Sequence, residues 1–76
     1  MHKKWEEQGC EYCRQYWLAR DGDLELINTS TEYHSRLYKC PKCNSLWEEN
    51  ERFACEVTAN DVIEYHGEAL REHNII

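Results

Sequence analysis

Apolar residues in the first three quarters of the chain occur in short runs broken by polar residues, a pattern typical of β-strands. Such runs cover residues 16–20, 24–28, 36–39, 46–49 and 52–57. Within the second run, Leu24 and Leu26 are expected on one face of a strand. Asp21-Gly22-Asp23 precedes it and supplies the positive φ of a tight turn. The pattern therefore predicts short antiparallel strands, with a polar loop over 28–35 and a turn near Asn50.

The last segment of the chain has a helical period instead. Thr58 and Asp61 have the spacing of a capping box, with Asp in place of the more usual Glu. Gly67 interrupts the pattern that follows. We predict a C-terminal helix over 59–72. The positions that recur at helical spacing are Val62, His66, Ala69, Leu70 and His73.

Two pairs of cysteines predict a metal site. Their spacing is C-x2-C-x26-C-x2-C, formed by Cys10, Cys13, Cys40 and Cys43. Two residues between cysteines allow a tight turn to direct both sulfurs at one ion. Four thiolates complete the tetrahedral coordination of Zn²⁺. A hydrophobic core alone is marginal for a chain of 76 residues, and domains this small usually carry a staple such as a metal. We therefore expect one structural Zn²⁺, with disulfides, free thiols or iron as the alternatives.

This arrangement resembles the zinc-ribbon fold group over about residues 9–57. The resemblance implies a small, metal-stabilised, mostly-β fold with two cysteine knuckles, to which the predicted helix is added within a single domain of residues 1–76. Many such knuckles continue into glycine, whereas Arg14 and Asn44 follow the pairs here. Asparagine tolerates left-handed geometry, so Asn44 fits. Arg14 fits less well, and the first knuckle is expected to depart from the usual shape. Rubredoxins, which hold iron, typically have glycine at both positions.

The charge of the chain is acidic and unevenly distributed. Nine Lys and Arg face fifteen Asp and Glu, a net charge of −6, and residues 44–76 hold eight of the acids and only two of the bases. Zinc bound by thiolates would make the net charge about −8. Such a charge disfavours binding to nucleic acid, which requires Lys and Arg against phosphates. No segment is apolar enough for a membrane span or a signal peptide, so a cytoplasmic location is expected.

The remaining reactive and aromatic residues have simpler interpretations. We expect Cys55 to be a buried side chain in a strand rather than a nucleophile. The histidines (His2, His34, His66 and His73) form no recognisable motif and are expected at the surface or in helix packing. Most of the aromatic side chains should surround the metal site, with one or two exposed. We identify no set of nucleophile, base and orienting group, so the chain is not expected to be an enzyme.

The first cysteine pair, Tyr38-x-Cys40-Pro41-x-Cys43-x-x-x-Trp47-Glu48 and the acidic tail resemble small zinc-ribbon immunity proteins of bacterial toxin systems. This resemblance implies a non-enzymatic inhibitor that covers a basic protein such as a toxin nuclease. Two alternatives remain open: an accessory factor of transcription or translation machinery, and a rubredoxin-like electron carrier. On the inhibitor reading, the expected partner-binding residues are Glu48, Glu49, Glu51, Asp61, Glu64, Tyr65 and Glu68.

Overall fold

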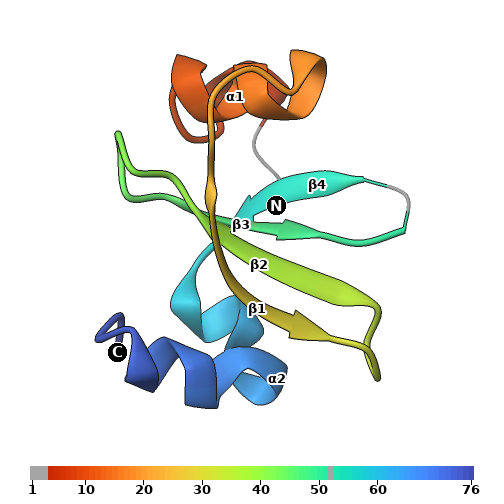
Figure 1. The fold of residues 1–76 in the computed structure, drawn as a ribbon, viewed down its shortest axis with the longest axis vertical. Coiled ribbons are helices and arrows are strands. Elements are labelled where there is room, and N and C mark those ends of the chain that lie inside the picture. Colours follow the sequence, from red (N-terminus) through yellow and green to blue (C-terminus); the bar gives the residue numbers. More distant parts are fainter. Residues whose placement is uncertain (1–3, 52) are drawn as a thin grey trace.

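A four-stranded antiparallel sheet with the strand order β1-β2-β3-β4 forms the middle of the molecule (Figure 1). The computed structural model describes residues 4–51 and 53–76. Along the chain the elements are η1 (Trp5–Glu7), α1 (Glu11–Ala19), β1 (Glu25–Ser30), β2 (Ser35–Lys39), β3 (Leu46–Glu49), β4 (Ala54–Val57) and α2 (Ala59–Glu72). The strands predicted over 36–39 and 46–49 and the helix over 59–72 are confirmed. The polar loop is shorter than predicted, because β1 continues to Ser30, and Arg52 lies outside the described residues.

The two helices lie on opposite faces of the sheet, which therefore has a buried cluster on each side (Figure 1). Alternation along the strands sends neighbouring residues to opposite faces. In β2, Leu37 packs with α2 and Tyr38 packs with the cysteine side; in β3, Leu46 and Trp47 divide in the same way. Each central strand thus contributes to two separate cores.

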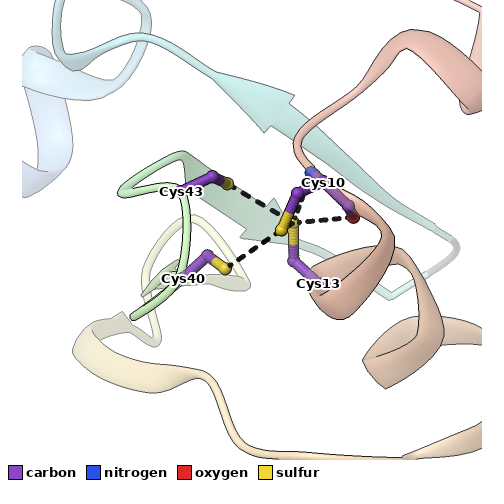
Figure 2. A group of neighbouring side chains, drawn as sticks. All are labelled: Cys10, Cys13, Cys40 and Cys43. Carbon is purple, nitrogen blue, oxygen red and sulfur yellow. Dashed lines mark hydrogen bonds between the residues drawn. The ribbon is translucent and has the colours of Figure 1, made fainter.

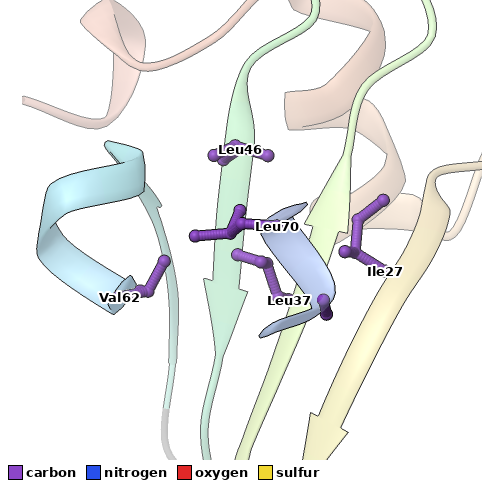
Figure 3. Packing of buried hydrophobic residues seen from close by; sticks show 6 residues of the cluster. Ile27, Leu37, Leu46, Val62 and Leu70 are labelled. Atoms are coloured by element: carbon purple, nitrogen blue, oxygen red, sulfur yellow. The ribbon is translucent and has the colours of Figure 1, made fainter. Parts of the chain in front are cut away.

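Helix α2 closes one face as its sequence pattern predicts (Figure 3). Thr58 caps it, because the Thr58 hydroxyl accepts from the Asp61 backbone N–H at 3.3 Å and the Asp61 carboxylate accepts from the Thr58 N–H at 2.8 Å. This capping box confirms the predicted start of the helix. The buried side chains of this core are Ile27, Leu37, Leu46, Val62, Ala69 and Leu70.

A β-bulge in β1 sets which residues of that strand reach α2. The register with β2 shifts between Leu26 and Asn28, so Ile27 is the extra residue. Ile27 packs in the core beneath α2, and the Asn28 side chain also bonds to α2 through His66. Leu24 is buried among the cysteines and aromatic rings, whereas Leu26 is 51% exposed.

The prediction of a strand over 16–20 is wrong, because this segment belongs to α1. Residues 10–20 contain no proline or glycine, and most residues of α1 are good helix formers. Cys10 caps the helix, and its backbone N–H donates to Cys13 Sγ at 3.1 Å. The helix ends at Arg20, whose φ is 55°. The aromatic residues that suggested a strand lie on the face of α1 that packs against Tyr38 and Trp47.

Candidate metal centre

The side chains of Cys10, Cys13, Cys40 and Cys43 converge on one point between α1 and the β2–β3 turn (Figure 2). The Sγ–Sγ distances are 3.7 Å for Cys10–Cys13, 3.7 Å for Cys10–Cys40 and 3.9 Å for Cys13–Cys43, and all four sulfurs lie within 4.8 Å of one another. A tetrahedral zinc at about 2.3 Å from each sulfur separates the sulfurs by about 3.8 Å. Disulfide sulfurs would be about 2.05 Å apart. The cluster therefore fits a metal ion and not disulfides.

The first cysteine pair lies at the start of a helix rather than in a β-knuckle. Cys10 is the N-cap of α1, and Cys13 lies in the first helical turn. Arg14 therefore has helical geometry, and its guanidinium donates to the Gln8 carbonyl at 2.8 Å. This is the departure that Arg14 predicted. The positive end of the helix dipole favours thiolates at this position.

The second pair lies in the tight turn between β2 and β3. Asn44 adopts φ 63°, which confirms the left-handed geometry expected there. Its backbone N–H donates to the Cys40 carbonyl at 2.9 Å, and the Lys42 N–H lies 3.4 Å from Cys40 Sγ. Ser45 Oγ lies 3.1 Å from Cys43 Sγ. The turn thus directs both sulfurs, with hydrogen-bond donors behind them, toward α1.

Burial disfavours a free thiolate, so a buried cysteine in this cluster is either a protonated thiol or a thiolate bound to a metal. Cys13 and Cys40 are fully buried. Burial raises the pKa of Cys13 to about 12 and also raises that of Cys40. Burial acts in the same direction on Cys43, but its hydrogen bonds with Ser45, Cys10 and Cys40 together outweigh it and lower the pKa to about 7. A soft divalent cation is the group that displaces protons from such buried thiols.

Aromatic rings surround the cluster, as predicted. Trp47 is fully buried and packs edge-on against Trp5 and tilted against Trp17, with ring centroids 5.4 and 5.9 Å apart. Within the described residues, the indole Nε1 atoms of Trp17 and Trp47 are buried without a hydrogen-bond acceptor. One or two exposed aromatic residues were expected, without their identity, and in the structure they are Tyr33 and Phe53.

The residues expected to bind a partner occupy three different environments. Glu48 and Tyr65 belong to an interior hydrogen-bond network, in which the Tyr65 hydroxyl donates to Glu48 Oε2 at 2.7 Å. Glu49 bridges Arg20 and Arg36, with N–O distances of 3.5 and 3.6 Å. The exposed members of the set are Glu51, Asp61, Glu64 and Glu68.

The interior network was not predicted from the sequence. Ser35 Oγ donates to Glu48 Oε2 at 2.7 Å and lies 3.0 Å from Nε2 of His66. The other ring nitrogen of His66, Nδ1, lies 2.9 Å from the side-chain amide of Asn28. Ser35 and His66 are both buried. The signal in the sequence was a histidine in line with the apolar positions of the helix, which indicated helix packing but not its partners.

Cys55 and the remaining histidines lie away from the cysteine cluster. Cys55 is half-buried in β4, where burial raises its pKa. His34 lies 3.4 Å from Glu51, and His73 lies 3.9 Å from Glu25. His2 lies outside the described residues. In the part of the chain that the structure describes, the metal-ligand cluster contains cysteines alone.

Comparison with known protein families, curated proteins and solved structures found no match to this chain. Neither helix of the described chain has the length and apolar character that crossing a membrane requires. The conclusion from geometry is that four cysteines lie close enough to bind one metal ion, within a small fold built on an antiparallel sheet and a C-terminal helix.

Proposed function

We propose that this chain is a zinc-stabilised, non-enzymatic module that binds a basic protein. The zinc would be held by Cys10, Cys13, Cys40 and Cys43, and when bound it supplies a cross-link between α1 and the β2–β3 turn. A set of four thiolates leaves no position for water or substrate, which is the arrangement of structural zinc sites. The metal centre would therefore stabilise the fold, and we assign the binding function to the surface of the protein.

The observation that carries the proposal is the outer face of α2. Buried residues of α2 face the sheet, and with a helical repeat of 3.6 residues the acids fall outside that buried stripe, with Glu68 and Glu72 on the flank nearest β1. Arg71 is the basic residue in α2. The exposed acids of this face are Asp61, Glu64, Glu68 and Glu72. A stripe of carboxylates on a rigid helix steers and orients a cationic protein surface.

The two acids of β3 already have partners within the chain. Glu48 accepts two internal hydrogen bonds, and Glu49 is already paired with Arg20 and Arg36. The partner contacts that we propose therefore centre on Glu64 and Glu68, with Asp61 one turn earlier in α2 and Glu51 as a further exposed acid near His34. Tyr65 stacks on Tyr33 at a centroid distance of 4.8 Å, so it would act as a rigid aromatic edge of the surface.

We propose the inhibitor form of this function, in which the acidic face covers the basic site of a toxin such as a nuclease. The support is the resemblance to zinc-ribbon immunity proteins together with the acidic net charge of −6. Such a complex should form quickly at low ionic strength and weaken as salt is added.

Native mass spectrometry of the protein, captured at low salt from its own cells, tests this function. We expect one bound zinc with loss of the thiol protons, and one basic protein retained in a salt-sensitive complex. The variant E64Q/E68Q should retain less of that protein than E6Q/D21N, which removes the same charge elsewhere on the exposed surface. Retention of nucleic acid, or of a polymerase or ribosomal assembly, would instead favour the accessory factor. Visible colour would indicate iron and an electron carrier.

A further inference from the structure

The two edges of the sheet differ. At the β4 edge, the backbone N–H of Glu56 donates to the Gln8 side-chain oxygen at 2.7 Å, so a side chain from the segment after η1 already occupies one backbone donor of that edge. Strand β1 forms the opposite edge and pairs with β2 on one side. An edge strand offers backbone N–H and C=O groups to another extended segment.

Helix α2 runs alongside β1 in the opposite direction. Three contacts appear in order along both elements: His73 with Glu25 at 3.9 Å, His66 with Asn28 at 2.9 Å, and Tyr65 stacked on Tyr33 just beyond the strand. A cavity of about 130 Å³ lies between the two elements, lined by Asn28, Tyr65, His66, Glu68, Ala69 and Glu72. A segment added to β1 would therefore lie beside this cavity.

The spacing of the cavity acids matches an extended chain. Glu68 and Glu72 are four residues apart on one helix, which places them about 6 Å apart along its axis. Alternate side chains of a β-strand point to the same face about 6.6–6.8 Å apart. A strand with cations at alternate positions would thus place one cation near each carboxylate.

The other face of β1 favours an apolar residue between those cations. Leu26 is 51% exposed at this edge and, by pairing with Tyr38, lies on the face opposite α2. The residues of an added strand that point away from α2 would pass beside Leu26. Alternation of basic and apolar residues is therefore the complementary pattern.

We propose that the edge of β1, which pairs with no second strand among residues 4–51 and 53–76, binds an extended segment of the partner in which basic and apolar residues alternate. The inference rests on the proposed function, since it names the part of the basic partner that is recognised. A second copy of this chain is a poor occupant, because its β1 would bring another Glu25 to an acidic edge.

The test uses two synthetic peptides of one composition, Lys-Val-Lys-Val-Lys and Lys-Lys-Lys-Val-Val, added to the zinc-loaded full chain. Amide chemical shifts and amide hydrogen exchange locate binding by NMR. We expect the alternating peptide to bind about tenfold tighter than its isomer and to slow exchange in residues 25–30. The substitutions E68Q/E72Q and L26K should each weaken that peptide about tenfold, whereas E6Q/D21N should not.

Equal binding of the two peptides, or slowed exchange at β4 instead of β1, would overturn the inference. Leu26 and both glutamates are exposed, so these variants are expected to fold, which the exchange pattern of the sheet verifies. If a basic protein is still captured in a salt-sensitive complex by E68Q/E72Q and L26K, the inference fails while the proposed function stands. If the alternating peptide binds as expected but no basic protein is captured, the proposed function fails, and the strand-binding property of the β1 edge stands without that partner.

Discussion

The hydroxyl of Ser35 in β2 lies 3.0 Å from Nε2 of His66 in α2, and both residues are buried. The Ser35 hydroxyl donates its proton to Glu48 at 2.7 Å, so its oxygen is left to accept from His66. His66 is then neutral with its proton on Nε2, and its Nδ1 accepts from the Asn28 amide. With the Asn28 amide nitrogen facing His66, both ring nitrogens of a neutral His66 have a hydrogen-bond partner.

Stability should therefore fall in mild acid through His66. Burial lowers its pKa below 6.5, although the Glu48 carboxylate acts in the opposite direction. As the pH falls below the unfolded value of 6.5, the unfolded chain binds a proton that the folded chain does not, and the free energy of unfolding decreases. Above that pH this contribution is fully present. Urea unfolding of the zinc-loaded protein across this range measures the effect.

The control for this prediction is H66Q, which keeps the cysteines and so shares any pH dependence of metal binding. It should be less stable than the wild type near neutral pH by about 1–3 kcal/mol. Its stability should also depend less steeply on pH below 6.5. An identical pH dependence in the two proteins would show that His66 is not the titrating group.

Glu48 and Glu68 should respond differently to the same substitution. Glu48 accepts from Ser35 and Tyr65, each at 2.7 Å, whereas Glu68 is exposed. We expect E48Q to lower the free energy of unfolding by about 1–3 kcal/mol through loss of charge-assisted hydrogen bonds. E68Q should change it by less than about 0.5 kcal/mol. Chemical denaturation measures the free energy of unfolding of both variants. Equal effects would show that the interior hydrogen bonds of Glu48 do not stabilise the fold.

Alanine should have opposite effects at two glycines. Gly9 has φ 57°, and a Cβ there would collide with Cys13 Sγ and lie 2.9 Å from the Trp47 ring. Gly67 lies inside α2, and its Cβ would meet the Ile63 side chain at 3.3 Å, which is 41% exposed and has room to move. We expect G9A to cost at least about 1 kcal/mol and G67A to add about 0.5–1 kcal/mol. Melting temperatures that move in the same direction would contradict this.

Removal of one metal ligand should affect stability far more than removal of the fifth cysteine. C13S takes a buried thiolate from the cluster, while C55S changes a half-buried residue in β4. Structural zinc contributes about 10–16 kcal/mol in small domains, so C13S should neither bind zinc tightly nor fold at ordinary temperature. C55S should bind one equivalent. Zinc titration with far-UV circular dichroism measures both, and tight zinc binding by C13S would reject the ligand set.

Local sequence signals predicted the elements whose causes are local. The capping box at Thr58 and the apolar period that follows it gave α2 to the residue. Helix α1 was missed because Tyr16 and Trp17 have high β-propensity, while the decisive interactions come from Cys10 at its start and from packing on Trp47. Propensity is a weak prior against such tertiary contacts. The bulge in β1 likewise depends on the register with β2, which one strand does not encode.

For the candidate site too, the features with a local sequence signal were predicted and those that depend on distant contacts were not. The four clustered cysteines share a recognisable spacing, and the structure brings all four sulfurs close enough to bind one metal ion. The roles of the acids were not predictable, because the sequence pattern around a strand glutamate does not show whether its side chain faces solvent or accepts a hydrogen bond from Ser35. The distinction between Glu48 and Glu68 depends on partners from β2 and α2, and only the assembled sheet places them in contact.

Each strand of the sheet pairs with its neighbour in the sequence. Forming such a sheet closes only short loops, and chains with mostly local pairing fold quickly. The contact between the two cysteine pairs spans a longer separation, 30 residues between Cys10 and Cys40. The hairpins are thus expected to assemble first, with metal capture as the late step that locks α1 onto them. The metal would then act chiefly on the rate of unfolding, which gives the module a long lifetime once it is loaded.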